Sequence, residues 1–279
     1  YEAPPANNEP PQPQLIALPG HRVILVWIIF AINIGMFGYS LLKGFSVMGS
    51  NPGDDTTLIN LGAKFSALID LDGQWWRFLT AMILHGGLVH LAFNSYALYI
   101  LGPEVERIYG APRFAAIYLA AGLGGSVGSY VFGDLFAPSI GASGAIFGLL
   151  GALAAFAYSA RETLGDTARR NLRQIAGVAA INLFIGFALP GIDNYAHLGG
   201  LIIGIVVGLL LAPQLRFVRN YDQIAIESQP SALFRWLGVI GALVILFSAT
   251  SIVHQRRLAD PAVVQELRDY RSWYLNALP

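Results

Sequence analysis

The sequence predicts an all-α membrane protein, a polytopic bundle of seven transmembrane helices. Of its 279 residues, 55% are hydrophobic and only 12% are charged, whereas about 25% of the residues in soluble domains are charged. Apolar runs near the roughly 20 residues that a membrane-spanning helix needs alternate with polar loops. The net charge is zero and cysteine is absent, so we expect no nucleic-acid partner and no disulfide or thiol nucleophile.

The elements are predicted in order along the chain. Residues 1–20 are rich in Pro, Asn and Gln, and we expect a disordered N-terminal tail. The seven predicted spans cover residues 23–42, 78–101, 114–136, 141–160, 172–189, 195–211 and 233–253. The long first loop, 43–77, carries an aromatic stretch that suits a membrane interface. We expect a cytoplasmic linker at 214–232 and an extracytoplasmic amphipathic tail at 254–279.

Arginine residues predict on which side of the membrane each loop lies. The loops after spans two, four and six carry arginines, among them Arg107, Arg161 and Arg216, whereas the loops after spans three and five carry no Lys or Arg. Positively charged loops stay in the cytoplasm, which predicts a cytoplasmic N-terminus and an extracytoplasmic C-terminus. A bacterial inner membrane fits this orientation best, and a eukaryotic secretory membrane is compatible with it.

Two polar residues in separate glycine-rich segments predict a catalytic pair. Ser143 lies near the start of span four and His197 near the start of span six. Both spans enter from the outer side, so the two residues lie at matching depths. A Gly-x-Ser-Gly segment alone most often serves helix packing, but a hydroxyl beside an imidazole is a nucleophile with its base. No Asp or Glu lies within a span near this level, so we predict a Ser-His dyad.

Small residues around the pair predict that the two helices approach closely. Glycines recur at four-residue or similar spacing after each polar residue, where they would form facing small surfaces. The glycines that we expect to support the site are Gly141, Gly144, Gly200 and Gly204.

Span two carries three polar residues, and each needs a partner away from water. His90 and Asn94 are four residues apart on one helix face and are predicted to donate hydrogen bonds to an oxyanion, together with the Ser143 N–H. His85 lies nearer the outer end and is expected to support the site. Hydrogen bonding between helices is the alternative interpretation for any one of them.

These motifs resemble the rhomboid family of intramembrane serine proteases over about residues 75–211. The segments HGGLVHLAFN (His85 to Asn94), GASG (Gly141 to Gly144) and AHLGGLIIG (Ala196 to Gly204) follow one another in the family's order. The resemblance implies Ser143 as nucleophile, His197 as base, and His90, Asn94 and the Ser143 amide as the oxyanion hole. It also implies a six-helix catalytic core at 21–213 with one additional helix at 233–253.

Further positions match the family outside the catalytic motifs. By resemblance, Trp76 and Arg77 correspond to the Trp-Arg pair of the first loop, and Glu106 belongs to a Gly-Glu-Gly pattern; Arg77 and Glu106 are implied to be structural. Phe147 stands where many members carry Tyr, so the ring contact with the imidazole is retained without the hydroxyl.

The resemblance also implies the substrates. Such enzymes cleave single-span transmembrane proteins near the outer membrane face and admit them sideways near helices two and five. Membrane lipids are the other expected partners, and no cofactor or metal is expected. The sequence does not specify an oligomeric state.

Three other functions were compared with the protease. His85, His90 and His197 are candidates for a three-histidine zinc hydrolase, but no HExxH segment is present and Ser143 would have no role. A non-proteolytic binder of membrane helices would typically lack the serine or the histidine. A transporter is disfavoured because the two halves show no inverted repeat.

Overall fold

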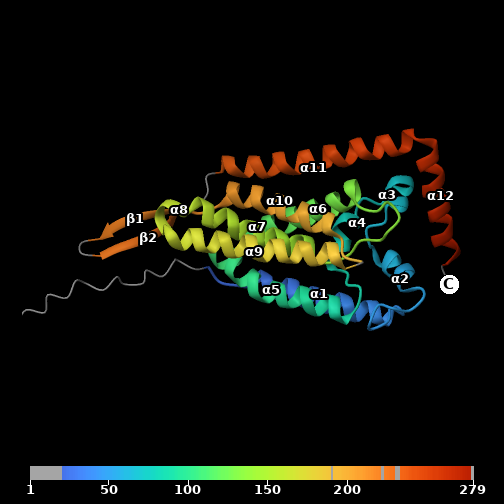
Figure 1. Cartoon of the computed structure of the whole chain (residues 1–279), viewed down its shortest axis with the longest axis horizontal. Helices are drawn as coiled ribbons and strands as arrows, with labels where there is room; N and C mark the ends of the chain where they lie inside the picture. The colour runs from blue at the N-terminus through green and yellow to red at the C-terminus, as the bar shows by residue number, and fades with distance from the viewer. Residues whose placement is uncertain (1–20, 190, 221–222, 230–232, 278–279) are drawn as a thin grey trace, which may run out of the picture.

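The structure, a computed structural model, describes residues 21–189, 191–220, 223–229 and 233–277. The predicted disordered tail, residues 1–20, lies outside the described residues. Long helices lie side by side along the long axis of the molecule; the short helices α2, α3 and α4 gather at one end, and α8 lies at the other (Figure 1). The helices are α1 (Leu25–Leu42), α2 (Asp54–Leu61), α3 (Ser66–Asp72), α4 (Arg77–Thr80), the 3-10 helix η1 (Ala81–Ile83), α5 (Leu88–Tyr109), α6 (Ala111–Phe132), α7 (Ser143–Ser159), α8 (Arg161–Leu164), α9 (Asp166–Ala188), α10 (Asn194–Leu211), α11 (Phe234–Ala259) and α12 (Pro261–Asn276).

Most of the long helices are apolar enough to cross a membrane. Among the described residues, five helices meet this condition by length and composition, namely α1, α6, α9, α10 and α11. A sixth span results if α4 and η1 are joined to α5 across a 90° bend. The remaining apolar helix, α7, has 17 residues and is shorter. The chain is therefore a mostly helical, multi-pass membrane protein.

The second predicted span, 78–101, was placed too early in the chain. The backbone turns by 90° between η1 and α5, so the long helix begins only at Leu88. Gly87 has a φ of 121°, and a Cβ there would lie 2.6 Å from the Met48 carbonyl oxygen. The Leu88 N–H donates to a first-loop carbonyl at 2.8 Å. Backbone contacts with the first loop thus break the helix, and His85 lies in the turn rather than inside a span.

The central helix of the bundle is α10, which packs against α6 and α7. At the end of α5, the Tyr109 hydroxyl lies 2.9 Å from the Ala152 carbonyl of α7 and 3.2 Å from the Gly208 carbonyl of α10. Tyr109 itself is buried. These contacts hold together the helices on which the two predicted catalytic residues lie.

The long first loop is folded rather than extended, and it contains α2, α3 and the start of α4. Its organising residue is Arg77, which is buried. The Arg77 guanidinium donates to the carbonyls of Ile59 at 2.6 Å and Ala63 at 2.9 Å. The first carbonyl lies in the last turn of α2, where helix carbonyls lack partners within the helix, and the second lies two residues after the helix ends. Arg77 therefore fastens α4 to α2.

The predicted amphipathic tail forms α12, but part of its apolar face is covered by the first loop instead of lying free at a membrane surface. Leu267 and Tyr274 are buried, and Arg271 pairs with Asp72 of α3 at 2.9 Å. Beside this buried face, α12 also presents exposed aromatic side chains, including Trp273. The additional helix α11 runs to Ala259, further than the predicted 233–253.

The predicted linker contains the one departure from an all-helical fold within the described chain. Strand β1 (Gln214–Asn220) pairs antiparallel with β2 (Gln223–Gln229), with Gln214 opposite Gln229 and Asn220 opposite Gln223. The sequence signal was the alternation of polar and apolar residues across this stretch, which is typical of strands. Outside this hairpin the described fold is helical, which fits the predicted all-α class.

Candidate active site

Ser143 is the first residue of α7 and follows the loop formed by residues 133–142. In this loop Gly141 has a φ of 119°, and a Cβ there would lie 2.9 Å from Nε2 of His90. Only glycine lets the loop pass so close to the imidazole. The Ser143 N–H lies in the first turn, where N–H groups have no partner within the helix and the dipole is positive. The serine thus lies where a negative charge is stabilised.

His197 lies in the first turn of α10, and its Nε2 is 2.9 Å from the Oγ of Ser143. Phe147, one turn after the serine on α7, stacks on the imidazole with ring centroids 4.3 Å apart and planes 12° apart. Both the serine and the histidine are partly exposed. The two residues, 54 positions apart in the chain, therefore meet in a hydrogen bond with the ring held by stacking.

Glycines set the distance between the two helices that carry this pair. A Cβ on Gly200 would lie 1.9 Å from the Gly144 carbonyl oxygen, and one on Gly204 would lie 2.2 Å from the Gly148 carbonyl oxygen. These separations are far below van der Waals contact, so α7 and α10 touch backbone to backbone. A short serine side chain can reach an imidazole on the next helix only at such an approach.

His90 and Asn94 lie in the first turns of α5, which packs against α7. The Gly86 N–H donates to Nδ1 of His90 at 3.2 Å, so the neutral imidazole carries its proton on Nε2, the atom that faces Gly141. Asn94 is buried, and its Nδ2 donates one hydrogen to the His90 carbonyl at 3.0 Å. The second Nδ2 hydrogen is not needed for that bond.

His85 lies in the turn before α5 and is fully buried. Its ring contacts the His90 ring edge to face, with centroids 5.4 Å apart. Within the described part of the chain, no group of three His, Cys, Asp or Glu side chains is arranged to hold a metal ion. His85 therefore packs against the site, and the three-histidine zinc alternative has no geometric support.

The three other motif residues lie away from Ser143 and His197. Trp76 is about half exposed, and the Arg77 guanidinium lies 4.7 Å from its ring centroid. Glu106 on α5 is fully buried, and its carboxylate accepts from the N–H groups of Ile24, Leu25 and Val26 at 2.9–3.0 Å. Glu106 thus supplies acceptors for the first turn of α1, which has no other capping side chain.

Two residues next to the pair were not identified from the sequence. Ser139 lies four residues before Ser143, and its Oγ donates to Oδ2 of Asp193 at 2.7 Å. Asp193 is also the N-cap of α10. An Asp directly before an apolar run is a typical N-cap signal, so its place was readable. Its contact with Ser139 depends on the tertiary fold and could not be predicted from the sequence.

Fold and site together define a class of protein, the multi-pass helical membrane proteins that hold a serine and an imidazole in contact at the starts of two neighbouring helices. Comparison with known families identifies which one. The Rhomboid domain matches residues 72–214, about half of the chain. The chain belongs to the rhomboid family.

Curated relatives agree with this assignment. Rhomboid protease GluP of Bacillus subtilis is 47% identical over 64% of this chain and 33% of its own length. RHOMBOID-like protein 6, mitochondrial, of Arabidopsis thaliana is 37% identical over 62% of this chain and 57% of its own. RHOMBOID-like protein 2 of the same plant is 33% identical over 76% and 66%, respectively. The chain thus spans about a third of GluP and little more than half of RHOMBOID-like protein 6.

Proposed function

We propose that the chain is an intramembrane serine endopeptidase with Ser143 as nucleophile and His197 as general base. The observation that carries this proposal is the 2.9 Å contact between Oγ of Ser143 and Nε2 of His197, at the N-terminus of α7. Membership of the rhomboid family supports it, as does the name of GluP, a rhomboid protease.

In the proposed reaction, neutral His197 takes the Ser143 proton on Nε2 while Oγ attacks the carbonyl carbon of the scissile peptide bond. The carbonyl electron pair moves to oxygen and forms an oxyanion. Its collapse breaks the C–N bond, the imidazolium gives its proton to the leaving amine, and the acyl group stays on Ser143 as an ester. Water, deprotonated by the same imidazole, then hydrolyses the ester and restores the serine.

Three donors are available for the oxyanion. The Ser143 N–H has no partner in the first turn of α7, the His90 Nε2–H faces Gly141, and Asn94 keeps a second Nδ2 hydrogen. Donors fixed before the reaction stabilise developing charge without reorganising. We assign the oxyanion hole to these three groups.

The proposed substrates are single-span transmembrane proteins that enter sideways between α5 and α9. Only Ala168, Ala179 and Gly186 of α9 are buried, so this helix is held loosely. Its free surface includes large apolar side chains such as Phe184 and Phe187, and the first turns of α5 expose Phe93. These surfaces are suited to contact lipid or an arriving helix. Cleavage would require a substrate segment that unwinds near the site.

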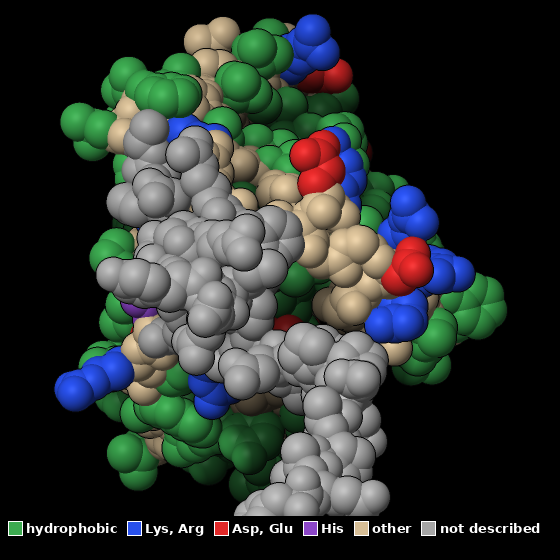
Figure 2. Space-filling view, turned by 90° about the vertical axis from the view of Figure 1, so that its left-hand side faces the viewer, with side chains coloured by type: hydrophobic (Ala, Val, Ile, Leu, Met, Phe, Trp, Pro, Cys, Tyr) green, Lys and Arg blue, Asp and Glu red, His purple; other side chains and the backbone are tan. Residues whose placement is uncertain are grey.

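We further propose seven spans and a cytoplasmic N-terminus. The shorter α7 counts as a span because it is almost wholly buried inside the bundle, so it need not match the lipid thickness. Basic side chains are visible around the end that carries β1, β2 and α8 (Figure 2), and positive loops favour the cytoplasm. Among the described residues, the exposed arginines near this end include Arg22, Arg107, Arg161, Arg169, Arg170 and Arg173.

The proposal is tested by reconstituting the protein in liposomes with a panel of single-span substrates and mapping the products by mass spectrometry. Ser143→Ala is expected to lower cleavage by at least about a thousandfold, because the nucleophile is lost. Ser159→Ala, at the exposed far end of the same helix, is the matched control and should cleave normally. Equal cleavage by Ser143→Ala, or binding without any cleavage by the unaltered protein, would reject the protease.

A further inference from the structure

A second hydrogen bond lies beside the contact between Ser143 and His197 and joins the segments that precede α7 and α10. Ser139 precedes Ser143 by four residues and Asp193 precedes His197 by four, so the Ser139–Asp193 hydrogen bond of 2.7 Å joins residues 54 apart, as the pair itself does. A hydrogen bond to a carboxylate at this distance is charge-assisted and stronger than a neutral one. The link therefore connects the segments that carry nucleophile and base just outside both helices.

Asp193 uses two acceptors to hold the first turn of α10 and a third to hold Ser139. Its Oδ1 accepts from the Ala196 N–H at 3.0 Å and its backbone carbonyl from the His197 N–H at 3.2 Å. The remaining oxygen, Oδ2, accepts from Ser139. Any displacement of the Asp193 carboxylate thus moves the turn on which His197 lies.

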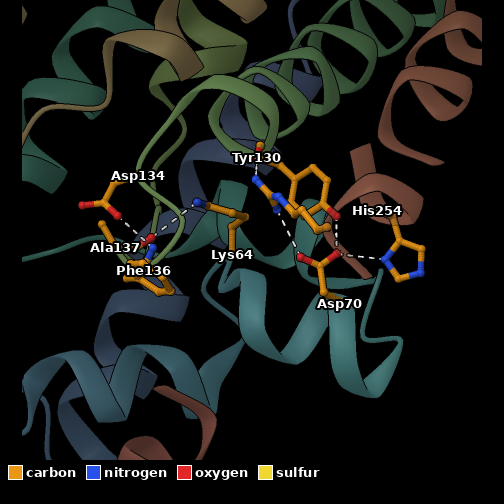
Figure 3. Close-up of polar contacts among 8 residues, drawn as sticks. Lys64, Asp70, Tyr130, Asp134, Phe136, Ala137 and His254 are labelled. Atoms are coloured by element: carbon orange, nitrogen blue, oxygen red, sulfur yellow. Dashed lines mark hydrogen bonds and ion pairs between the residues drawn. The ribbon is translucent and has the colours of Figure 1, made fainter. Parts of the chain in front are cut away.

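Ser139 is in turn held to the first loop. Its backbone N–H and carbonyl pair with those of Lys64 at 3.0 Å each, as an isolated antiparallel bridge. The Gly141 N–H donates to the Ala81 carbonyl at 2.9 Å. Figure 3 shows the Lys64 side chain reaching toward Ala137 of the same loop, where Nζ lies 3.4 Å from the carbonyl. The 133–142 loop is therefore anchored before it meets Asp193.

We infer that Asp193 is a positioning residue, which holds the 133–142 loop to the start of α10 through Ser139 and so sets the distance between Ser143 and His197. This inference rests on the proposed function of that pair. Bond-making steps depend steeply on such distances, and a misplacement near 1 Å costs on the order of a hundredfold in rate. The proposed entry of the substrate between α5 and α9 does not involve these residues. We therefore expect their substitution to lower kcat rather than to raise KM.

The test compares Ser139→Ala, Ser139→Thr and Asp193→Asn in the full chain, with kcat and KM measured on a cleaved single-span substrate. Ser139→Ala is expected to lower kcat about tenfold and leave KM within about twofold. Ser139→Thr keeps the hydroxyl and should restore kcat. Asp193→Asn keeps Oδ1 for the Ala196 N–H, and its amide nitrogen can donate to the Ser139 Oγ, so it loses only the charge assistance and should lower kcat less than Ser139→Ala does. Asp134→Asn, an exposed carboxylate of the same loop, is the matched control.

A serine-reactive probe counts intact sites, so that kcat is expressed per labelled molecule. Unchanged kcat per labelled site in Ser139→Ala, with only fewer sites, would show a merely structural role and overturn the inference. Equal impairment of Ser139→Thr and Ser139→Ala would also overturn it. The double variant Ser139→Ala/Asp193→Asn should be no slower than Ser139→Ala, because both substitutions act on the same contact, and full additivity contradicts this. Ser143→Ala tests the proposed function separately. Normal cleavage by Ser143→Ala would reject Ser143 as nucleophile, whereas the outcomes above test only the positioning role of Asp193.

Discussion

At the scale of single residues, the candidate site depends on contacts that hold His197 without a charged partner at its second nitrogen. Within the described residues, Nδ1 of His197 is buried and has no hydrogen-bond partner. The ring is instead fixed by stacking on Phe147 and by its contact with Ser143. A serine triad uses a carboxylate for this purpose. In the proposed dyad, the orientation of the imidazole therefore comes from packing.

Gly141 gives the residue-scale prediction. Gly141→Ala forces a side chain into a φ of 119° and places its Cβ 2.9 Å from Nε2 of His90, which costs about 1–3 kcal/mol of local strain. We expect kcat/KM to fall by at least about tenfold, because the His90 donor is displaced from the proposed oxyanion. Gly38→Ala, a helical glycine of α1 with open space around it, is the control. Full activity of Gly141→Ala would remove His90 from the oxyanion hole.

At the scale of elements, the helices are attached to the bundle to different degrees. The helices α6, α7 and α10 meet through backbone contacts at glycines, whereas α9 buries only three residues. The first helix, α1, is mostly exposed along its length but is joined at its start to Glu106 of α5. The proposed dyad therefore lies among the tightly packed helices, and the helices around it are held by fewer contacts.

Glu106 carries the prediction at this scale. In the unaltered protein, three N–H groups at the start of α1 share the Glu106 carboxylate. Glu106→Gln leaves them one neutral acceptor oxygen, and the new amide hydrogens are buried without acceptors. We expect a loss of about 1–3 kcal/mol in the free energy of unfolding, read as a lower melting temperature in detergent. Glu104→Gln, on the exposed side of the same helix, should melt like the unaltered protein. Equal melting of both variants would contradict a capping role for Glu106.

At the scale of the whole molecule, the first loop, the 133–142 loop and the C-terminal helices form one assembly at the end where α7 and α10 begin (Figure 1). Buried Asp70 of α3 accepts from Nδ1 of His254 at 2.9 Å and from Arg257 at 3.1 Å, both on α11, and also bonds the hydroxyl of Tyr130 on α6 (Figure 3). A buried carboxylate is tolerable only with such partners. The additional helix is therefore fastened to the first loop by polar contacts.

Lys64 in this assembly gives a prediction for stability against pH. Burial lowers the pKa of Lys64 from 10.5 to about 8, and Asp193 is the strongest influence in the opposite direction. Between these two pH values the unfolded chain binds more protons, so the free energy of unfolding rises with pH by at most about 1.4 kcal/mol per unit. Lys64→Met lacks this contribution.

The measurement compares melting temperatures of the unaltered protein and Lys64→Met from pH 7.5 to 10. Other groups titrate in both proteins, so their contributions cancel in the difference between the two melting temperatures. The melting temperature of the unaltered protein should rise relative to that of Lys64→Met as the pH rises. A constant difference would mean that Lys64 keeps an ordinary pKa in the folded protein.

The helices were largely predictable because hydropathy is a local property of the chain. Each predicted apolar run corresponds to a helix of the structure, and Ser143 and His197 were placed at helix starts from sequence. The misplaced start of span two had a different cause. Its apolar residues continue through 78–83, but the first loop breaks the helix at Gly87 by backbone contacts that no local pattern encodes.

Taken alone, the sequence determined the membrane class, the helix order and the identity of the candidate catalytic residues, because these follow from residue type and spacing. Only the tertiary structure decided that Oγ of Ser143 and Nε2 of His197 come within 2.9 Å, and that Ser139 reaches Asp193 beside them. Such distances are set by how glycine surfaces of separate helices pack. Packing between segments far apart in the chain depends on all of them at once.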